Sequence, residues 1–453
     1  MVERLSFFGL GKLGLPLAAL FAQSGVRTIG IDIDAGLIAR LNAGETPYVE
    51  PGLAELLKEA APAITYTTDA LAATDTEASI ILVPTPSTPE APEFSINDVA
   101  KACGDLASAL RTRTRPRYHL IIISSTVAPG AIGNRITTLL EDALGQRAGR
   151  DFGIAYVPDF VALGDIVKGF KQTPFLLVGS DDATATAKTV ALYRRIVAPN
   201  AHLCLLSTLD AEITKVAHNV YCCMKVSFGN FLAQLSDRFG GADLDAIAAA
   251  LGHAPNVQSG YLRAGGPFGG PCLPRDTVAF MHLANSLGLE APLARAAEAI
   301  NAAQYDLIER HLLASKPRSV AMLGLSFKPG TPVTIASPAF EFVTRLLRRS
   351  VKVFTYDPMT EARKQARAAF GAAITCCETL AEALAAADAV LICNPDPSFT
   401  GLGRNAPPDR PIIDPWGCIK DPHPGLVRPG RLPLGAKLAA ASIDPAPVPA
   451  EAR

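Results

Sequence analysis

Short apolar runs alternate with amphipathic segments along roughly the first 200 residues of the chain. The opening stretch, RLSFFGLGKLGLPLAALFAQSGVRTIGIDID, contains an apolar run, a glycine turn, an amphipathic segment and a second apolar run that ends in acidic residues. Further apolar runs follow at ASIILVPTP, YHLIIISST, FGIAYVP and PFLLVGS, with helical patterns between them. This alternation predicts a mostly parallel sheet covered by helices on both faces.

From about residue 201 to 315 the pattern is helical only. One long helix is predicted from Ser207 to Phe239, ended by Gly240 and Gly241. Its apolar side chains recur at helical spacing: Ile213, Val216, Val220, Met224, Phe228, Phe231 and Leu235. Further helical segments follow this helix, so we expect a central domain made of helices.

Strand and helix patterns alternate again from Ser319, at SVAMLGLSFKPG, VKVFTYDP, DAVLICNPDP and PIIDPWG. Their order repeats that of the first half, which indicates a weak internal duplication in which only the first copy has a full phosphate-binding fingerprint. The predicted fold is α/β: two Rossmann-like doubly wound domains, 1–200 and 316–436, joined by a central helical domain, 201–315. The Ala/Pro-rich tail, 437–453, is predicted to be disordered.

Composition narrows the function classes. The 453 residues have a formal net charge of −1, with acidic and basic residues mixed, so nothing favours nucleic acid or a membrane surface as a partner. No run reaches the roughly 18 to 20 apolar residues of a membrane span, and no signal peptide pattern precedes the first strand. We therefore expect a cytoplasmic protein that acts on a small molecule. The nine cysteines have no metal-ligand spacing, so no metal is expected and most cysteines are interpreted as buried apolar side chains.

The first glycine turn predicts a dinucleotide site. Gly9 permits a tight turn, Gly11 lets the backbone approach a pyrophosphate, and Gly14 lets helix and strand pack closely. Asp32 ends the next strand, where a carboxylate binds the ribose 2′-hydroxyl and repels a 2′-phosphate. The pattern therefore predicts NAD rather than NADP, with Asp34 as the alternative acidic residue. Further candidates for cofactor contacts are Lys12, Leu13, Thr85, Pro86 and Thr126.

The stretch GGPCLPRD raises the question of a reactive thiol at Cys272. Pro274 suits the first turn of a helix, so Cys272 lies just before a helix N-terminus, whose dipole favours a thiolate. Arg275 adds to this effect, while Gly269 and Gly270 leave room for a ligand to approach. A turn in which the cysteine is only a small apolar side chain explains the same residues equally well.

Lys215 and Asn219 lie four residues apart on the predicted long helix, nearly opposite its apolar side chains. Periodicity alone therefore predicts that both face solvent.

Eight ordered motifs carry a resemblance over nearly the whole chain. They are GLGKLGLP, LNAGETPYVEPGLAELL, VPTP, SSTVAPG, PDFVALG, AEITKVAHN, FGGPCLPRD and GLSFKPGT. The chain resembles the UDP-glucose/GDP-mannose dehydrogenase family of nucleotide-sugar 6-dehydrogenases. The resemblance implies two Rossmann-like domains and a long central helix that also builds a homodimer.

The resemblance also implies a four-electron oxidation. NAD⁺ takes a hydride from C6 of the sugar, Cys272 captures the aldehyde, a second NAD⁺ oxidises the thiohemiacetal, and water releases the carboxylate. It implies that Lys215 and Asn219 stabilise the oxyanion at C6, and that Asp276 and Thr126 handle water and protons.

Further residues match the family's substrate site. By resemblance Phe327 and Lys328 reach the substrate from the C-terminal domain, and the nucleotide sugar packs against Phe268, Gly269 and Gly270. The glutamate that the family uses in thioester hydrolysis corresponds to the shorter Asp159.

Four other positions depart from the family. A second glutamate is replaced by Leu163, a lysine by Arg275, and two arginines by Ile335 and Asn256. Because the nucleophile and its polar partners remain, we expect a divergent but active enzyme acting on a UDP-hexose or a UDP-N-acetylhexosamine. The alternatives are a catalytically silent nucleotide-sugar-binding protein and a two-electron hydroxyacid dehydrogenase of similar architecture.

Overall fold

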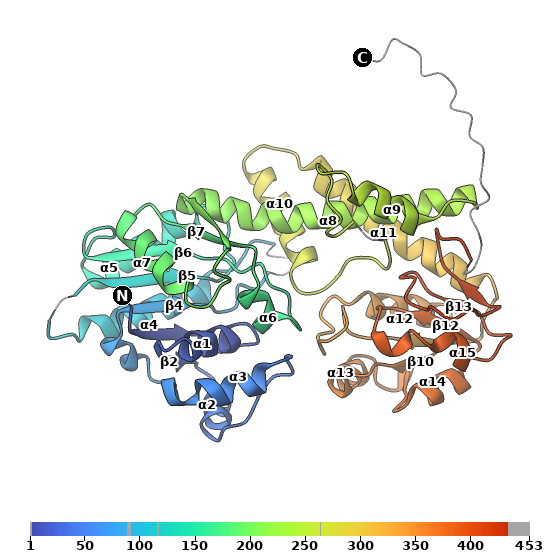
Figure 1. Ribbon diagram of the computed structural model, residues 1–453, viewed down its shortest axis with the longest axis horizontal. Helices are drawn as coiled ribbons and strands as arrows, with labels where there is room; N and C mark the ends of the chain where they lie inside the picture. The colour runs from blue at the N-terminus through green and yellow to red at the C-terminus, as the bar shows by residue number, and fades with distance from the viewer. Residues whose placement is uncertain (1, 88–91, 116, 263, 434–453) are drawn as a thin grey trace, which may run out of the picture.

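The computed structural model describes residues 2–87, 92–115, 117–262 and 264–433. In these ranges two sheets lie at opposite ends of the molecule, and a group of helices runs along one side of both (Figure 1). The predicted fold class, α/β with two largely parallel sheets and a helical central part, is therefore confirmed. The tail predicted to be disordered, 437–453, lies outside the described residues.

The N-terminal sheet has eight strands in the order β3-β2-β1-β4-β5-β6-β7-β8. Their bounds are β1 Arg4–Phe8, β2 Arg27–Ile31, β3 Ile64–Thr67, β4 Ala78–Ile81, β5 His119–Ile123, β6 Phe152–Tyr156, β7 Phe175–Gly179 and β8 His202–Leu206. Neighbouring strands are parallel except for β6 and β7, which are antiparallel. Every residue of β4, β5 and β6 is buried, which explains why these strands are apolar runs rather than alternating ones.

Helices cover both faces of this sheet. Apolar side chains of α1, α3, α6 and α7 form one cluster, and those of α4 and α5 belong to a second. The helix bounds are α1 Gly14–Gln23, α2 Ala35–Asn42, α3 Leu53–Ala60, α4 Asn97–Arg111, α5 Thr137–Leu144, α6 Ile166–Lys171 and α7 Ala183–Tyr193. Because strand order reverses between β1 and β4, a ligand crevice is expected at the carboxyl ends of these two strands.

The C-terminal sheet is parallel throughout, in the order β11-β10-β9-β12-β13-β14. Its first five positions repeat the order β3-β2-β1-β4-β5 of the N-terminal sheet, which agrees with the predicted internal duplication. The bounds are β9 Ser319–Leu323, β10 Lys352–Tyr356, β11 Thr375–Cys376, β12 Ala389–Ile392, β13 Ile412–Ile413 and β14 Leu426–Val427, with helices α12 Pro338–Arg348, α13 Thr360–Phe370, α14 Leu380–Ala386 and α15 Leu402–Asn405.

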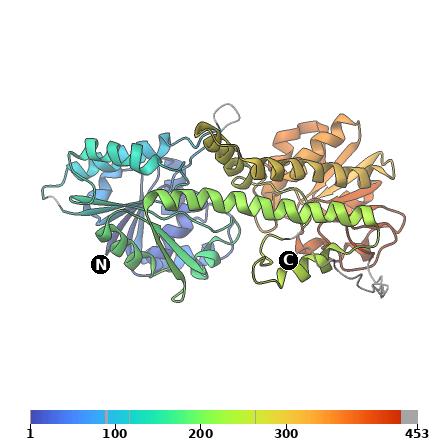
Figure 2. The ribbon, with the colours of Figure 1, turned by 90° about the horizontal axis from the view of Figure 1, so that it is seen from above.

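The central helices are α8 (Thr208–Phe239), α9 (Leu244–Gly252), α10 (Leu273–Ser286) and α11 (Pro292–Leu313). The predicted long helix is confirmed as α8: the Ser207 hydroxyl accepts from the backbone N–H of Asp210, and Gly240 ends the helix at a φ of +68°. α8 extends from the N-terminal sheet to the C-terminal one, with α11 packed beside it (Figure 2). Within the described ranges, no helix has both the length and the apolarity needed to cross a bilayer.

The buried side of α8 is only partly the one that its periodicity predicts: Val216 and Val220 are buried, but other residues of the apolar stripe are not. Ile213, Phe228 and Phe231 are between 46% and 48% exposed, whereas Lys215 and Asn219 are buried at 8% and 7%. The prediction that Lys215 and Asn219 face solvent is therefore wrong. Their side of the helix packs against the N-terminal domain and α10, and most of the apolar stripe is left at the surface.

Candidate active site

A cavity of about 540 Å³ lies at the carboxyl ends of β1, β2 and β4 and is lined by the glycine turn. Gly9 has a φ of +96°, and a Cβ atom there would lie 2.2 Å from the carbonyl oxygen of Leu82. A Cβ atom at Gly14 would lie 2.0 Å from the carbonyl oxygen of Gly9, whereas one at Gly11 would meet no atom within 4 Å. Turn, packing and open approach are thus divided among the glycines as the fingerprint requires.

Asp32, which follows β2, is one of the acidic residues that line this cavity. Its carboxylate accepts hydrogen bonds from the backbone N–H of Leu10 at 2.7 Å and of Asp34 at 3.0 Å, so its position is fixed by the glycine turn itself. The Asp34 carboxylate instead caps α2, accepting from two backbone N–H groups. The structure therefore favours Asp32 for a ribose hydroxyl, and the open backbone at Gly11 fits a pyrophosphate.

Other lining residues agree with the sequence only in part. Lys12 and Leu13 line the cavity as predicted, but Val83 and Pro84 do so rather than Thr85 and Pro86. Contacts from Thr85 and Pro86 to a cofactor therefore stay a prediction. The sequence analysis missed three polar residues of α4 and one tyrosine on the cavity wall, which have no motif of their own: Asp98, Lys101, Asp105 and Tyr48.

Cys272 immediately precedes α10, and its thiol is exposed. Enough protein surrounds the sulfur that desolvation raises the pKa of Cys272, and the charge of Asp276 adds to this. Arg275 and Lys215 act in the opposite direction, as the sequence predicts for Arg275, but burial outweighs them. Arg275 therefore favours the thiolate as expected, but it does not offset the desolvation, and the net pKa of Cys272 is raised.

Next to the cysteine, hydrogen bonds join the side chains of Asn219, Asp276 and Arg275. The Asp276 carboxylate has no exposed surface and accepts from the Asn219 amide at 2.5 Å and from the Arg275 guanidinium at 2.8 Å. Arg275 also lies over the ring of Phe94, 5.1 Å from its centroid. Charge pairing and stacking thus hold Asp276 and Asn219 next to the start of α10.

Lys215 belongs to the same cluster. Its ammonium donates to the backbone carbonyl of Asp159 at 2.5 Å and lies 4.8 Å from the ring centroid of Phe160. Burial lowers the pKa of Lys215, while the nearby charges of Asp276 and Cys272 raise it. A buried cation beside the thiol is suited to stabilise an oxyanion.

The side chain of Asp159 does not take part in the hydrogen bond that its backbone carbonyl accepts from Lys215. It is 8% exposed, and one of its oxygens has no hydrogen-bond partner within the described part of the chain. It lines a small cavity of about 30 Å³ that Tyr193 also lines. Burial raises the pKa of Asp159 to about 7, although Lys215 lowers it. Only the carbonyl of Asp159 is bonded to Lys215, and its carboxylate is available to bind a water in the cavity.

Thr126 follows β5 and is half-buried. The loop after it is tied to α8 by Glu212, whose carboxylate accepts from the backbone N–H of Gly130 at 2.6 Å and of Ile132 at 2.9 Å. The sequence analysis missed Glu212, because nothing in a helical pattern marks a carboxylate that anchors a distant loop.

The substrate-loop residues pack against the C-terminal domain. The N–H of Gly270 donates to the carbonyl of Ala336 at 3.1 Å, and a Cβ atom on Gly270 would lie 2.5 Å from the ring of Phe327. Phe268 is buried and its backbone is held by the side-chain amide of Asn301. In this structure protein fills the space at Gly269 and Gly270 that was expected to admit a ligand.

Lys328 faces the N-terminal domain. Burial lowers its pKa, and the charges of Asp165 and Glu50 raise it. Of the departures from the family, Leu163 lines a cavity of about 430 Å³ between the two domains, and Ile335 is 62% exposed.

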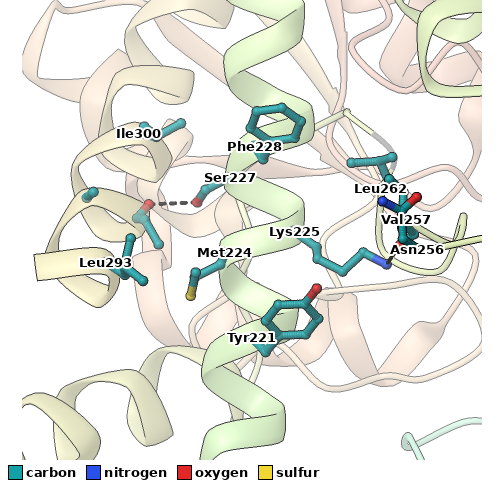
Figure 3. A pocket seen from close by; sticks show the side chains of 12 residues that line it. Tyr221, Met224, Lys225, Ser227, Phe228, Asn256, Val257, Leu262, Leu293 and Ile300 are labelled. Carbon is teal, nitrogen blue, oxygen red and sulfur yellow. Dashed lines mark hydrogen bonds between the residues drawn. The ribbon is translucent and has the colours of Figure 1, made fainter. Parts of the chain in front are cut away.

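A separate apolar cavity of about 360 Å³ lies between α8, α11 and the segment after α9 (Figure 3). Asn256 lines it together with Tyr221 and Leu293, and the Lys225 ammonium donates to the carbonyls of residues 257 and 258. It shares no lining residue with the glycine-lined cavity.

The sheet topology and the glycine-lined cavity define a protein of the dinucleotide-binding Rossmann class. Models of the UDP-glucose/GDP-mannose dehydrogenase family match three parts of the chain: the NAD-binding domain at residues 3–197, the central domain at 209–303 and the UDP-binding domain at 321–421. The chain belongs to this family of NAD-dependent oxidoreductases that act on nucleotide sugars.

Relatives of known activity carry different names. The chain is 32% identical to GDP-mannose 6-dehydrogenase of Azotobacter vinelandii, covering 91% of this chain and 96% of that one. It is 33% identical to UDP-glucose 6-dehydrogenase AglM of Haloferax volcanii, covering 90% and 96%. Among solved structures, it is similar to a UDP-glucose dehydrogenase from Pyrobaculum islandicum, with a TM-score of 0.84, 29% identity and coverage of 91% and 94%.

Proposed function

We propose that this protein oxidises C6 of a UDP-hexose or UDP-N-acetylhexosamine to a carboxylate through a covalent intermediate on Cys272. The observation that carries the proposal is the exposed thiol of Cys272 beside the buried chain of Lys215, Asn219 and Asp276. A two-electron alcohol oxidation needs no thiol, whereas capture of an aldehyde does. The presence of a UDP-binding domain supports a nucleotide sugar as the substrate.

The glycine turn and Asp32 would hold NAD⁺, and two NAD⁺ molecules bound in succession would each supply one hydride acceptor for the two oxidations at C6. The chain's own residues do the remaining work. Lys215 and the free N–H of Asn219 hold the C6 oxygen while negative charge develops on it. The Cys272 sulfur bonds to the aldehyde carbon, so that loss of the second hydride leaves a thioester. Water cleaves the C–S bond, giving the carboxylate and the free thiol.

Proton transfer is assigned to the carboxylates and to Thr126. Asp276 would accept a proton from the reacting groups, with Thr126 as a hydroxyl partner for water, and the ion pair of Asp276 with Arg275 supports a fixed carboxylate there. Asp159, with a pKa of about 7, can act as a base for water near neutral pH. We propose that the nucleotide sugar binds when the loop at 268–270 moves away from the C-terminal domain. The residues that would then receive it are Phe268, Gly269, Gly270, Phe327 and Lys328.

The decisive experiment counts NADH per sugar acid with NAD⁺ and a panel of UDP- and GDP-sugars. Two NADH per acid support the proposal, and one contradicts the four-electron route. Cys272→Ala should make no sugar acid, while Cys376→Ala, a half-buried cysteine in the C-terminal sheet, should leave turnover unchanged. Sugar acid formed by Cys272→Ala at the normal rate would refute the thioester. Tight UDP-sugar binding without NADH formation across the panel would favour a catalytically silent binding protein. The replacement of a family arginine by the exposed Ile335 agrees with that alternative.

We also propose a homodimer through α8. The support is the apolar stripe that α8 leaves at the surface, which continues into the cavity of Figure 3. Phe231→Lys should convert a dimer into a monomer in sedimentation, and Leu71→Lys, on an exposed position of the N-terminal domain, should not. A monomeric wild type would overturn this proposal. The domain limits at 200, 315 and 436 and the cytoplasmic location stay predictions.

A further inference from the structure

His218 lies on α8 directly before Asn219, and both of its ring nitrogens have partners. Nδ1 lies 3.0 Å from the side-chain oxygen of Asn219, and Nε2 lies 3.9 Å from the sulfur of Cys222. The ring packs edge-on against Phe160, with centroids 4.9 Å apart, and the Lys215 ammonium also lies over the ring of Phe160. His218 is thus in contact with two elements of the catalytic cluster, although the mechanism above gives it no part.

The hydrogen positions along the bonds from Asp276 to Asn219 and His218 follow from the ionised carboxylate of Asp276. Asp276 is paired with Arg275, so its carboxylate can only accept, and the amide of Asn219 must turn its NH₂ group toward it. The amide oxygen therefore faces His218. Because that oxygen is also only an acceptor, the proton of His218 must be on Nδ1.

The second nitrogen completes the chain. With Nδ1 protonated, a neutral imidazole has an acceptor at Nε2, which suits the S–H of Cys222. Burial and the charge of Lys215 lower the pKa of His218, so the neutral ring persists at neutral pH. The hydrogen bond to Asn219 is kept in either protonation state, because Nδ1 is a donor in both.

We propose that His218 is a positioning residue for Asn219, holding the amide so that its remaining N–H points at the C6 oxygen of the sugar. The two ends of the amide are fixed by opposite partners, Asp276 at the nitrogen and His218 at the oxygen. A fixed donor stabilises a developing oxyanion without reorganisation during the reaction. The catalytic part of this inference rests on the proposed function.

The test uses two substitutions with opposite losses. His218→Phe keeps a ring against Phe160 but removes the donor, whereas His218→Asn loses the ring but places an amide N–H near the position of Nδ1. We expect His218→Phe to lower kcat about five- to tenfold, with KM within about twofold, because one hydrogen bond is lost. His218→Asn should stay within about twofold of wild-type kcat, as should the control His253→Phe at the exposed end of α9.

Two kinetic outcomes overturn the inference: a wild-type kcat in His218→Phe, or equal losses in both variants, which would mean that only packing matters. A second measurement does not depend on turnover. In the ¹⁵N spectrum of histidine-labelled protein at neutral pH, assigned by the signal that His218→Phe removes, we expect protonated Nδ1 and unprotonated Nε2. The opposite tautomer refutes the inference. If wild-type protein makes no NADH but shows the expected tautomer, the proposed function is refuted, whereas the hydrogen bond by which His218 orients the Asn219 amide is supported.

Discussion

At the scale of single residues, burial determines the chemistry more than local sequence does. Cys272 stands at a helix N-terminus beside an arginine, yet desolvation raises its pKa. Lys215 and Asp159 are also shifted mainly by desolvation, the first downward and the second upward. The family resemblance of the motifs predicted that Cys272, Lys215, Asn219 and Asp276 lie together, as they do in the structure. It could not predict their protonation, which depends on how much protein from distant segments surrounds each group.

Asp159 gives a pH-dependent prediction for stability. Its pKa rises from 3.8 in the unfolded chain to about 7 in the folded protein. At a pH between these two values the folded protein holds a proton that the unfolded chain has lost, which stabilises the folded state relative to high pH. This stabilisation is full below pH 3.8 and is lost as pH rises through about 7, where the buried carboxylate ionises. Above about pH 7, Asp159→Asn should therefore have a higher urea midpoint than wild type. Its free energy of unfolding should be higher by about 4 kcal/mol at most. Asp142→Asn, on an exposed position, should show no such difference, and parallel pH curves for Asp159→Asn and wild type would contradict the prediction.

Arg275 gives a second prediction at this scale. Asp276 has no exposed surface, so removing its guanidinium partner leaves an uncompensated buried charge. Arg275→Ala should lower the free energy of unfolding by about 3–5 kcal/mol, and Arg275→Lys by less because it keeps the charge. Arg404→Ala, which breaks an ion pair at a 79% exposed arginine, should cost at most about 1 kcal/mol. Equal urea midpoints for Arg275→Ala and Arg404→Ala would show that the buried pair contributes nothing special.

At the scale of elements, α8 shows where periodicity fails. Its bounds were predicted within one residue, because Ser207 and Gly240 are capping signals that act locally. Its orientation was not, since the stripe of larger apolar side chains need not be the side buried in a single chain. Polar residues such as Glu212 and Asn230 occupy the inner side because each has a specific partner there. Such partners come from loops far away in the sequence and leave no periodic signal.

Glu212 supports an element-scale prediction. Its carboxylate joins α8 to the loop after β5 through two backbone N–H groups, and it is fully buried. Glu212→Ala leaves both groups without a partner and should cost about 2–4 kcal/mol in urea unfolding. Glu212→Gln keeps one acceptor and should cost less. Glu55→Ala, on an exposed position of α3, should change stability by no more than about 0.5 kcal/mol. A Glu212→Ala midpoint equal to that of Glu55→Ala would contradict the anchoring role.

At the scale of the whole molecule, the alternation of apolar runs and helices predicted largely parallel sheets, and right-handed crossovers limit the strand orders that such sheets can have. The approach of the two domains does not follow from it. Lys328 is brought close to Asp165 and Glu50, which no local pattern links. The sites that face each other across the domains therefore required the structure or the family resemblance.

One glycine makes this approach testable. Gly164 has a φ of +83°, and a Cβ atom there would lie 2.7 Å from the carbonyl oxygen of Gly330 in the C-terminal domain. Gly164→Ala therefore adds a clash between domains to the backbone strain, whereas Gly145→Ala, at a φ of +65° with no atom within 4 Å, adds strain alone. Both variants should lose about 1 kcal/mol of stability from strain.

Only Gly164→Ala should also move the 327–334 loop, and with it Lys328, away from the N-terminal domain. Since Lys328 is expected to contact the substrate, we predict that kcat/KM for the sugar falls about tenfold or more in Gly164→Ala and stays near wild type in Gly145→Ala. Steady-state kinetics with saturating NAD⁺ measure both. If the two variants lose kcat/KM equally, backbone strain accounts for the effect, and the close contact of Gly164 with Gly330 does not set the distance across which the substrate is held.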